Sequence, residues 1–276
     1  MPTLSVVIPA YNEQESIAQT LASIPVRQLE STGLGVEILV VDNGSTDDTG
    51  RLARAHGARV IVQPVRGYGN AYRAGFANCL GDVIATGDAD LTYPFEILPD
   101  AIAMLDAQRL DFLSTNRLES LTPQAMSRSH LWGNRVLSTM THVLFRLPFD
   151  DSQSGMWVFR RHVLSGLRLA AGGMAFSQAL KVEVFRRGFR CGELPITYRP
   201  RGGRTKMRPV RDGLCNVGQL VASRFHATEP VGPRLAGASR SLVGAADPLR
   251  RSTIISVELP EPTGRPTPQA ATESVG

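Results

Sequence analysis

Asp88 and Asp90 stand two residues apart, directly after the apolar residues 83–85, a run typical of a buried strand. Side chains at this spacing on an extended chain point the same way, so both carboxylates can sit at the mouth of a sheet. Paired carboxylates repel each other unless a cation lies between them. A hard divalent ion, Mg²⁺ or Mn²⁺, carrying a diphosphate meets that need. A solvated polar turn is the competing interpretation.

A second chemical feature is a cluster of basic residues late in the chain. The 276-residue sequence has a formal net charge of +5. Thirteen consecutive residues hold six basic side chains and no acid, namely Arg199, Arg201, Arg204, Lys206, Arg208 and Arg211. Such a run favours a phosphate-rich ligand or an anionic membrane surface, with a solvated face as the alternative.

The elements that must position these residues alternate between strand and helix patterns. Apolar runs predict strands over residues 4–9, 36–41, 59–62 and 82–86. Helical spacing follows over residues 13–24, with Asn12 as N-cap, and over 46–56 and 70–80. This alternation predicts an α/β fold with a mostly parallel central sheet flanked by helices. The polar clusters at 9–13, 42–47 and 88–92 all follow strands, so we expect them to meet along one edge.

The second half of the chain is less regular. We expect helices over residues 94–108, 129–145, 177–187 and 210–225, and strands over 112–114, 156–159 and 193–198. Residues 227–276 contain no aromatic residue and seven of the chain's 18 prolines. That composition predicts a disordered tail after a domain spanning residues 1–226.

Several classes of protein are disfavoured by what the sequence lacks. No apolar run approaches the roughly 18 residues that cross a membrane, and the N-terminus lacks a signal-peptide pattern. The three widely spaced cysteines favour a cytoplasmic protein with reduced thiols. Neither a dinucleotide-binding glycine motif nor a P-loop follows the first strand. The basic run lacks the interleaved aromatic residues of a nucleic-acid-binding surface, so we expect no nucleic-acid partner.

Taken together, these motifs resemble family 2 glycosyltransferases of the GT-A fold. The resemblance is greatest to the branch that transfers mannose or glucose to polyprenyl or dolichol phosphate, and it runs in order from about residue 4 to residue 226. The matching pieces are VIPAYNE (residues 7–13), VVDNGSTD (40–47), RGYGNA (66–71), GDAD (87–90), DSQSGM (151–156) and ELPI (193–196) followed by RGGRTK (201–206).

The resemblance assigns roles to residues on the donor side. Pro9, Tyr11, Glu13 and Asp42 would hold the base and ribose of a nucleotide sugar, since a carboxylate accepts strong hydrogen bonds from hydroxyl and N–H groups. Asp88 and Asp90 would bind Mg²⁺ or Mn²⁺ across the diphosphate. Thr92 stands where relatives often carry a residue that helps the metal, which leaves a third protein ligand open.

On the acceptor side, the resemblance places Gln153, with Ser154 and Gly155, beside the donor sugar. Arg117, Arg204 and Lys206 correspond to basic positions that contact phosphates, for which a guanidinium fork and an ammonium are both suited. Thr205 replaces the common Ser before Lys206 and keeps the hydroxyl.

The implied activity is an inverting transfer of mannose or glucose from GDP-Man or UDP-Glc to a polyprenyl phosphate. A phosphate acceptor is already anionic and needs no general base. A soluble hydroxyl acceptor is the alternative and would need one, for which Asp151 and Glu183 are available. A nucleotide-sugar-binding protein without catalysis is a third hypothesis. The amphipathic residues 210–225 could lie on the cytoplasmic membrane face as a peripheral contact, with packing against the core as the alternative.

Overall fold

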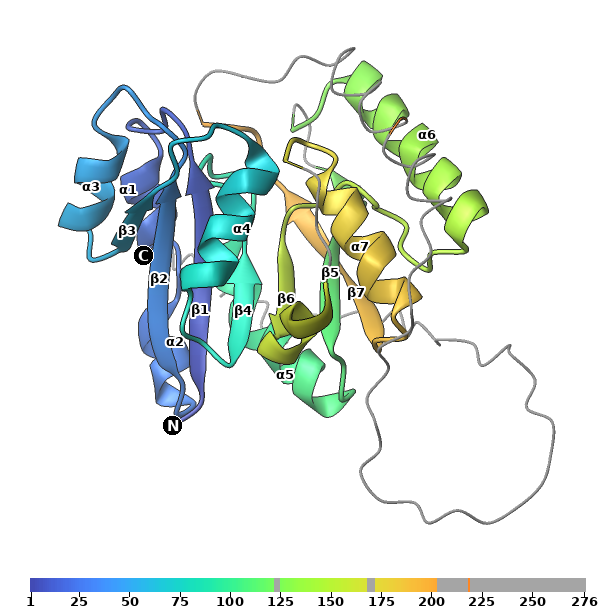
Figure 1. Ribbon diagram of the computed structural model, residues 1–276, viewed down its shortest axis with the longest axis horizontal. Coiled ribbons are helices and arrows are strands. Elements are labelled where there is room, and N and C mark those ends of the chain that lie inside the picture. The colour runs from blue at the N-terminus through green and yellow to red at the C-terminus, as the bar shows by residue number, and fades with distance from the viewer. Residues whose placement is uncertain (122–124, 168–171, 203–217, 219–276) are drawn as a thin grey trace, which may run out of the picture.

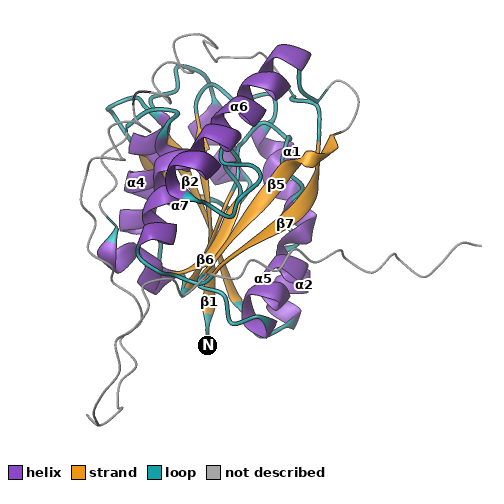
Figure 2. Cartoon of the chain, turned by 90° about the vertical axis from the view of Figure 1, so that its right-hand side faces the viewer, coloured by secondary structure: helices purple, strands orange, loops and turns teal. Residues whose placement is uncertain are grey.

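A seven-stranded sheet runs through the molecule, with helices on both of its faces (Figures 1 and 2). The computed structural model describes residues 1–121, 125–167, 172–202 and 218. The strand order is β3-β2-β1-β4-β6-β5-β7. The strands are β1 (Thr3–Ala10), β2 (Gly35–Asp42), β3 (Arg59–Val62), β4 (Val83–Thr86), β5 (Phe112–Leu121), β6 (Trp157–Arg160) and β7 (Cys191–Tyr198).

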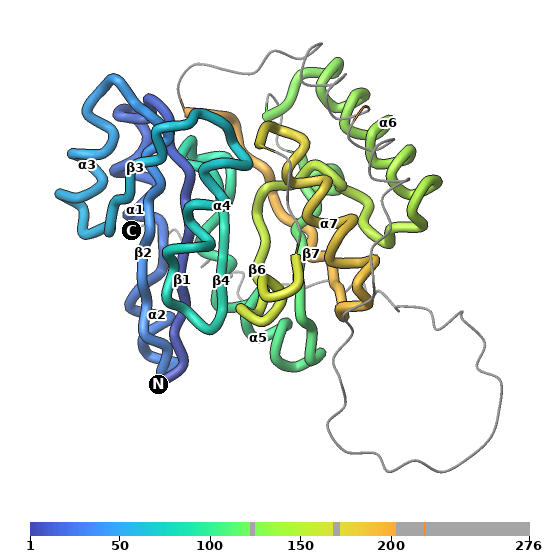
Figure 3. The backbone as a smooth tube through the Cα atoms, in the orientation of Figure 1, coloured from blue at the N-terminus to red at the C-terminus, as the bar shows by residue number. Residues whose placement is uncertain are grey.

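Six strands point the same way, and only β6 runs against its neighbours β4 and β5. The predicted mostly parallel α/β architecture is therefore confirmed. Because β6 is reversed, the segment that precedes it lies at the edge where the other strands end. Loops from both halves of the chain consequently converge on one carboxyl edge, as the chain path in Figure 3 shows.

The helices form two layers. The α4 and α7 helices cover one face, while α1, α2 and α5 cover the other (Figure 2). The helices are α1 (Ile17–Ala22), α2 (Val26–Ser31), α3 (Thr49–Ala55), α4 (Tyr68–Asn78), α5 (Leu98–Ala107), α6 (Arg128–Phe145) and α7 (Phe176–Arg186), with 3₁₀ turns η1 (Phe95–Ile97) and η2 (Arg161–Gly166).

The two layers have separate apolar cores because strand side chains alternate between faces. In β1, Val6 and Ile8 pack with the α1–α2–α5 side, whereas Val7 packs with α4 and α7. Tyr72 of α4 stacks on Phe176 of α7, with ring centroids 5.7 Å apart, and fixes these two helices together. The sheet that carries the polar loops is thus buried on both faces.

The structure differs from the local predictions mainly at three places. The first helix begins at Ile17 rather than at residue 13, and Asn12 is not its N-cap, because Asn12 adopts a left-handed backbone with φ 53°. β5 continues to Leu121 through polar residues that sequence pattern does not mark as a strand. The short α2, which buries only Leu29, was not expected. The predicted helix at 210–225 and the tail at 227–276 lie outside the described residues, apart from residue 218.

Candidate active site

Acidic side chains that are far apart in the sequence meet at the carboxyl edge of the sheet. Glu13 follows β1, Asp90 follows β4, and the guanidinium of Arg201, which follows β7, lies between them. Arg201 Nη2 donates to Glu13 Oε1 at 2.7 Å, and Arg201 Nη1 lies 3.2 Å from Asp90 Oδ2. Both acids are buried. The clusters that follow β1 and β4 therefore share one cation position.

The cluster after β2 is hydrogen-bonded to the one after β1. The Asn12 side-chain oxygen accepts from the backbone N–H of Thr46 at 2.8 Å, and the Asn12 backbone N–H donates to Ser45 Oγ at 3.0 Å. Asp42, the last residue of β2, accepts from the backbone N–H of Ser45 at 2.8 Å. The expectation that all three clusters meet along one edge is confirmed.

A flat surface lies next to Asp42. The Arg66 guanidinium covers the Tyr11 ring at 4.6 Å from the ring centroid, and it also donates to the backbone oxygen of Gly44 at 3.2 Å. Pro9, two residues before Tyr11, is paired with Val41 in the sheet. An aromatic face, a guanidinium and a carboxylate at one place can together bind a base and its ribose.

Asp88 lies half-buried beside Asp90 and is held by Tyr68, whose hydroxyl donates to Asp88 Oδ1 at 3.2 Å. Burial, and next the negative charge of Asp90, raise the pKa of Asp88 to about 7. A cation beside such a carboxyl group stabilises its charged form. Arg201 supplies that positive charge in this structure.

The donor set fits a hard divalent ion. Mg²⁺ binds proteins through one or two carboxylates and completes its shell with water and substrate phosphates. In the described part of the chain, no three His, Cys, Asp or Glu side chains gather where they could hold a metal by themselves. Asp88 and Asp90 therefore suit an ion that arrives with a diphosphate.

Thr92 orients Asp90. Its hydroxyl donates to Asp90 Oδ1 at 2.6 Å, and its backbone N–H donates to the same oxygen at 3.2 Å. Both interactions engage one carboxylate oxygen, which leaves Oδ2 to face the cation position. The hydroxyl of Thr92 thus acts on the aspartate itself.

Arg117 and Asp151 form a buried ion pair on the other side of the site. Arg117 donates to Asp151 through Nε at 2.7 Å and Nη2 at 3.0 Å, and Asp151 is fully buried. Burial alone would raise the pKa of Asp151, but Arg117 and Lys181 outweigh that effect and lower it. Each Asp151 oxygen also accepts a backbone N–H, from Arg117 at 3.1 Å and Gln153 at 3.0 Å. Such a carboxylate has no oxygen free to take a proton from an acceptor.

A second buried pair of ionisable groups lies behind this one. Lys181 is fully buried and donates to the backbone oxygen of Asp151. Glu193 accepts the backbone N–H groups of Asp150 at 2.9 Å and Asp151 at 3.2 Å. Burial lowers the pKa of Lys181 to about 8 and raises the pKa of Glu193 to about 7. These contacts fix the backbone that carries Asp151 and Gln153.

The segment of Gln153, Ser154 and Gly155 packs closely on tyrosines. The Gly155 N–H donates to Tyr93 Oη at 2.7 Å, and its backbone oxygen accepts from Tyr72 Oη at 3.2 Å. A Cβ at position 155 would collide with the Tyr68 hydroxyl. Gly155 is therefore required for this approach, which brings Gln153 to the same edge as Asp88.

Not every predicted site residue is placed by the structure. Arg204 and Lys206 lie outside the described residues. Glu183 lies on α7, where its Oε1 accepts from Arg187 Nε at 2.7 Å. Arg201, Arg66 and Tyr68 contact predicted site residues but received no individual role from the sequence. The signal was present, because all three fall in the motifs RGYGNA and RGGRTK.

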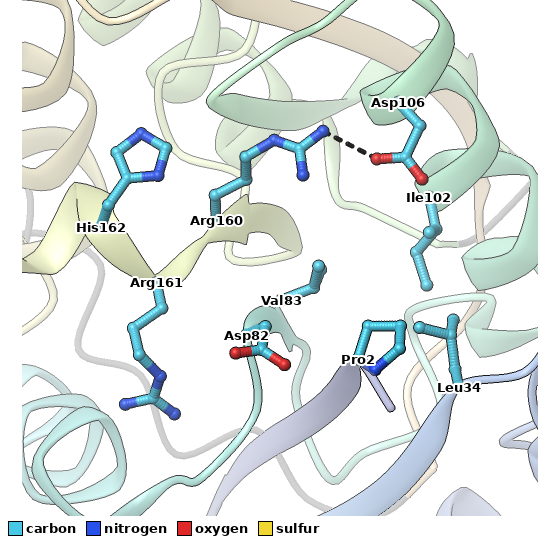
Figure 4. A pocket seen from close by; sticks show the side chains of 9 residues that line it. All are labelled: Pro2, Leu34, Asp82, Val83, Ile102, Asp106, Arg160, Arg161 and His162. Atoms are coloured by element: carbon cyan, nitrogen blue, oxygen red, sulfur yellow. Dashed lines mark hydrogen bonds and ion pairs between the residues drawn. The ribbon is translucent and has the colours of Figure 1, made fainter. Parts of the chain in front are cut away.

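A separate cavity of about 490 Å³ lies at the opposite edge of the sheet, around Pro2 and Asp82 (Figure 4). Its charged side chains are already engaged within the protein. Arg160 pairs with Asp106 at 2.7 Å, and Arg161 donates to the backbone oxygens of Gly81 and Cys79. This cavity is therefore distinct from the acidic site.

Across the helices in the described ranges, none is both long enough and apolar enough to cross a bilayer.

The sequence matches the model of a known enzyme family. Residues 5–168 match the family model "Glycosyl transferase family 2", which covers more than half of the chain. The chain belongs to this family and is an enzyme of the glycosyltransferase class.

Named relatives come from the same family. The low-salt glycan biosynthesis hexosyltransferase Agl6 of Haloferax volcanii is 37% identical over 78% of this chain and 52% of its own length, so the chain spans about half of that relative. A dolichyl-phosphate hexose transferase of the same organism is 33% identical over 79% of this chain and 92% of its own. An undecaprenyl-phosphate 4-deoxy-4-formamido-L-arabinose transferase of Klebsiella pneumoniae is 31% identical over 72% of this chain and 60% of its own.

A solved structure shares the fold. Glucosyl-3-phosphoglycerate synthase of Mycobacterium tuberculosis, crystallised with Mn²⁺, UDP and glucosyl-3-phosphoglycerate, superposes with a TM-score of 0.66 at 25% identity. The match covers 81% of this chain and 80% of the synthase. The GT-A fold expected from the sequence motifs is thereby confirmed.

Proposed function

We propose that this chain is a metal-dependent, inverting hexosyltransferase that moves mannose or glucose from a nucleotide sugar to a polyprenyl phosphate. The observation that carries the proposal is the meeting of Asp88 and Asp90 with Glu13 and Asp42 at one sheet edge, across from the Gln153 segment. The names of the dolichyl-phosphate and undecaprenyl-phosphate relatives support the class of acceptor.

The donor side stabilises the leaving group. Asp42 and the Tyr11–Arg66 surface bind the nucleoside, and Asp88 and Asp90 hold the divalent ion. That ion supplies positive charge to the departing diphosphate when it is bound. Thr92 keeps Asp90 oriented during transfer, and an oriented carboxylate stabilises charge without reorganising.

The acceptor side favours an anion. A lipid phosphate attacks the anomeric carbon through an oxygen that is already ionised, so no residue has to remove a proton. The full set of donors around Asp151 supports this choice, because a hydroxyl acceptor requires a carboxylate within reach and with a free oxygen. Arg204 and Lys206 remain our proposed contacts for the phosphates.

The donor is GDP-Man or UDP-Glc, and the UDP bound by the solved relative supports testing UDP-Glc first. We also propose that residues 1–226 form the catalytic domain and that it works at the cytoplasmic membrane face.

Transfer to lipid is tested directly with radiolabelled donor. The protein is incubated with Mn²⁺, undecaprenyl phosphate and labelled GDP-Man or UDP-Glc, and the organic phase is counted. We expect label in that phase with one of the two donors. Donor turnover without organic-extractable label would contradict the lipid acceptor.

Asp90→Asn tests the role of the metal. The substitution keeps the shape of the side chain but removes the charge, so we expect turnover to fall at least ~100-fold. We also expect the variant to lose the rise in melting temperature that Mn²⁺ with UDP gives the unaltered protein. Unchanged turnover would rule out the metal-assisted mechanism.

A soluble hydroxyl acceptor is the second candidate. The observation in its favour is the solved relative, whose crystal contains glucosyl-3-phosphoglycerate rather than a lipid. Label retained in the aqueous phase as a new glycoside would identify this alternative.

A further inference from the structure

The outer face of α6 exposes two large apolar side chains. Trp132 is 71% exposed and Val143 is 70% exposed. They are eleven positions apart in the sequence, which places them about 20° apart around the helix at 100° per residue. They therefore lie on one side of α6, one toward each end of the helix.

The same face is basic. Arg128, Arg135 and Arg146 are exposed, the first two on α6 and the third at its C-cap. No acid occurs anywhere between Glu119 and Asp150 in the sequence. An exposed tryptophan among arginines, with acids excluded over such a length, is the pattern of a helix that lies in a membrane interface.

The inner face of α6 is fixed to the active site. Leu137, Ser138 and Thr141 are its buried residues. The backbone N–H of Ser152 donates to Ser138 Oγ at 3.0 Å, and Gln178 of α7 donates to Thr141 Oγ1. The buried residues of α6 thus face the protein core, and the outer face with Trp132 and Val143 points away from it. Through Ser138, α6 is attached to Ser152, the residue next to Gln153.

The position of α6 suits contact with a surface. Figures 1 and 2 both show α6 at the end of the sheet away from the N-terminus, which is the end that carries the site. A flat surface that touched the outer face would lie on the acceptor side of the molecule.

We propose that the outer face of α6, namely Arg128, Trp132, Arg135, Val143 and Arg146, docks onto an anionic lipid bilayer and so presents the Gln153 segment to the membrane. This inference rests on the proposed lipid acceptor. It adds a contact surface within the described residues to the one expected at residues 210–225. Trp132 lies at the level of the headgroups, and the arginines contact lipid phosphates.

Tryptophan fluorescence reports this contact, because the chain has two tryptophans and the other, Trp157, is fully buried. The full chain is mixed with phosphatidylcholine vesicles, with or without phosphatidylglycerol, and with brominated lipid as quencher. We expect a blue shift and quenching only with phosphatidylglycerol, and neither response in Trp132→Phe. Binding without any change in Trp132 emission, or no binding to anionic vesicles, would overturn the proposal.

Substitutions can separate the contribution of the apolar side chains on the outer face of α6 from the contribution of its arginines. Trp132→Ser with Val143→Ser should weaken vesicle binding in sedimentation by at least about tenfold. Arg128→Gln and Arg146→Gln should each weaken it about fivefold and lower its dependence on salt. Leu80→Ser is the matched control, since Leu80 is 72% exposed but bonds to Ser5 at the opposite edge. An equal loss in Leu80→Ser would contradict docking through α6.

The acceptor can be varied to separate this proposal from the proposed function. With a short, water-soluble polyprenyl phosphate, the Trp132→Ser, Val143→Ser variant should turn over like the unaltered protein. With long-chain acceptor in vesicles its rate should fall. Vesicle binding by the unaltered protein without transfer to either acceptor would leave docking intact and reject the lipid-transfer function, whereas equal rates on both acceptors would reject docking.

Discussion

Arg201 occupies the place where a divalent cation would neutralise the acidic site. It bridges Glu13 and Asp90, and among the described residues its buried Nε finds no acceptor. Two anchors hold the segment that carries it, since the Gly202 N–H donates to the backbone oxygen of Asp90 and the Arg199 N–H donates to that of Thr92. We therefore expect Arg201 and a bound metal to compete for Asp90.

Arg201→Ala should consequently bind Mn²⁺ more tightly. We expect a gain of about fivefold in affinity for Mn²⁺ alone by titration calorimetry, since one partly exposed ion pair is exchanged for the metal. Arg199→Ala is the control, because Arg199 pairs with Glu96 instead. Equal or weaker Mn²⁺ binding by Arg201→Ala would show that the two cations do not compete.

The Arg117–Asp151 pair has a different role, because it is enclosed by protein. Removing one member of a buried pair leaves an uncompensated charge, which costs far more than breaking an exposed pair. Asp151→Asn should therefore destabilise the protein by about 3–5 kcal/mol in denaturant unfolding. Asp48→Asn, which breaks the exposed pair with Arg51, should leave the free energy of unfolding nearly unchanged. Similar losses in both variants would contradict this assignment.

Among the individual site residues, the sequence predicted the positions of the acidic side chains better than those of the basic ones. Glu13, Asp42, Asp88 and Asp90 follow strands, so their position at one edge follows from a parallel sheet. Arg201 lies 188 positions from Glu13, and no local pattern indicates which of six clustered basic residues turns inward. The ion pair between Arg117 and Asp151 could not be predicted from the sequence either, because it depends on the continuation of β5 beyond Ser114.

Among the elements, α4 approaches the sheet through a glycine. A Cβ at Gly75 would lie 3.1 Å from Val41 Cγ2 and closer still to Val7 Cγ1. The absence of a side chain lets α4 lie directly on β1 and β2. The N-terminus of this helix carries Tyr68, so the packing of Gly75 also sets the support of Asp88.

Two glycine-to-alanine changes separate packing from helix propensity. Gly75→Ala should destabilise the protein by about 1–3 kcal/mol because it overpacks the contact with β1. Gly133→Ala in α6, where a Cβ would meet nothing within 4 Å, should stabilise it by about 0.5–1 kcal/mol. Denaturant unfolding of each variant would measure both changes. A stabilising effect at both positions would mean that α4 does not press on the sheet.

The helices and strands with the strongest hydrophobic pattern in the sequence were predicted most accurately. The strand at 59–62 was predicted to the residue, and the helix predicted at 129–145 differs by one residue at its start. The first helix was predicted four residues too early, because the side chains of Asn12 and Glu13 bond within the site instead of starting a helix. Tertiary contacts overrode the local signal there.

For the whole molecule, the buried Glu193 makes stability depend on pH. Burial raises its pKa from 4.5 to about 7 in the folded protein. The folded state thus holds a proton that the unfolded chain releases at lower pH. The stabilisation is fully present below the unfolded pKa and is lost as pH rises through the folded pKa.

We therefore expect the free energy of unfolding to fall from about pH 5.5 to about pH 7, and to fall less in Glu193→Gln. Denaturant unfolding at the two pH values gives the comparison. Lys181 titrates mainly above this window, because its lowered pKa is about 8. The same change at the exposed Glu119 serves as control. An identical pH slope in Glu193→Gln would contradict the role of this group.

The residues on the two sides of the site also come from separate parts of the sequence, which meet in the sheet where β4 pairs with the reversed strand β6. The acids that we propose hold the nucleotide and its metal come from residues 13–90, whereas the Arg117–Asp151 pair and the Gln153 segment come from residues after 110. β4 and β6 join the halves through three antiparallel residue pairs. Recombination in the turn at residues 108–111 would exchange the proposed acceptor residues together with Arg201, while leaving Glu13, Asp42, Asp88 and Asp90 in place. We expect such a topology to let a lineage acquire new acceptors by inheriting a second half from a relative.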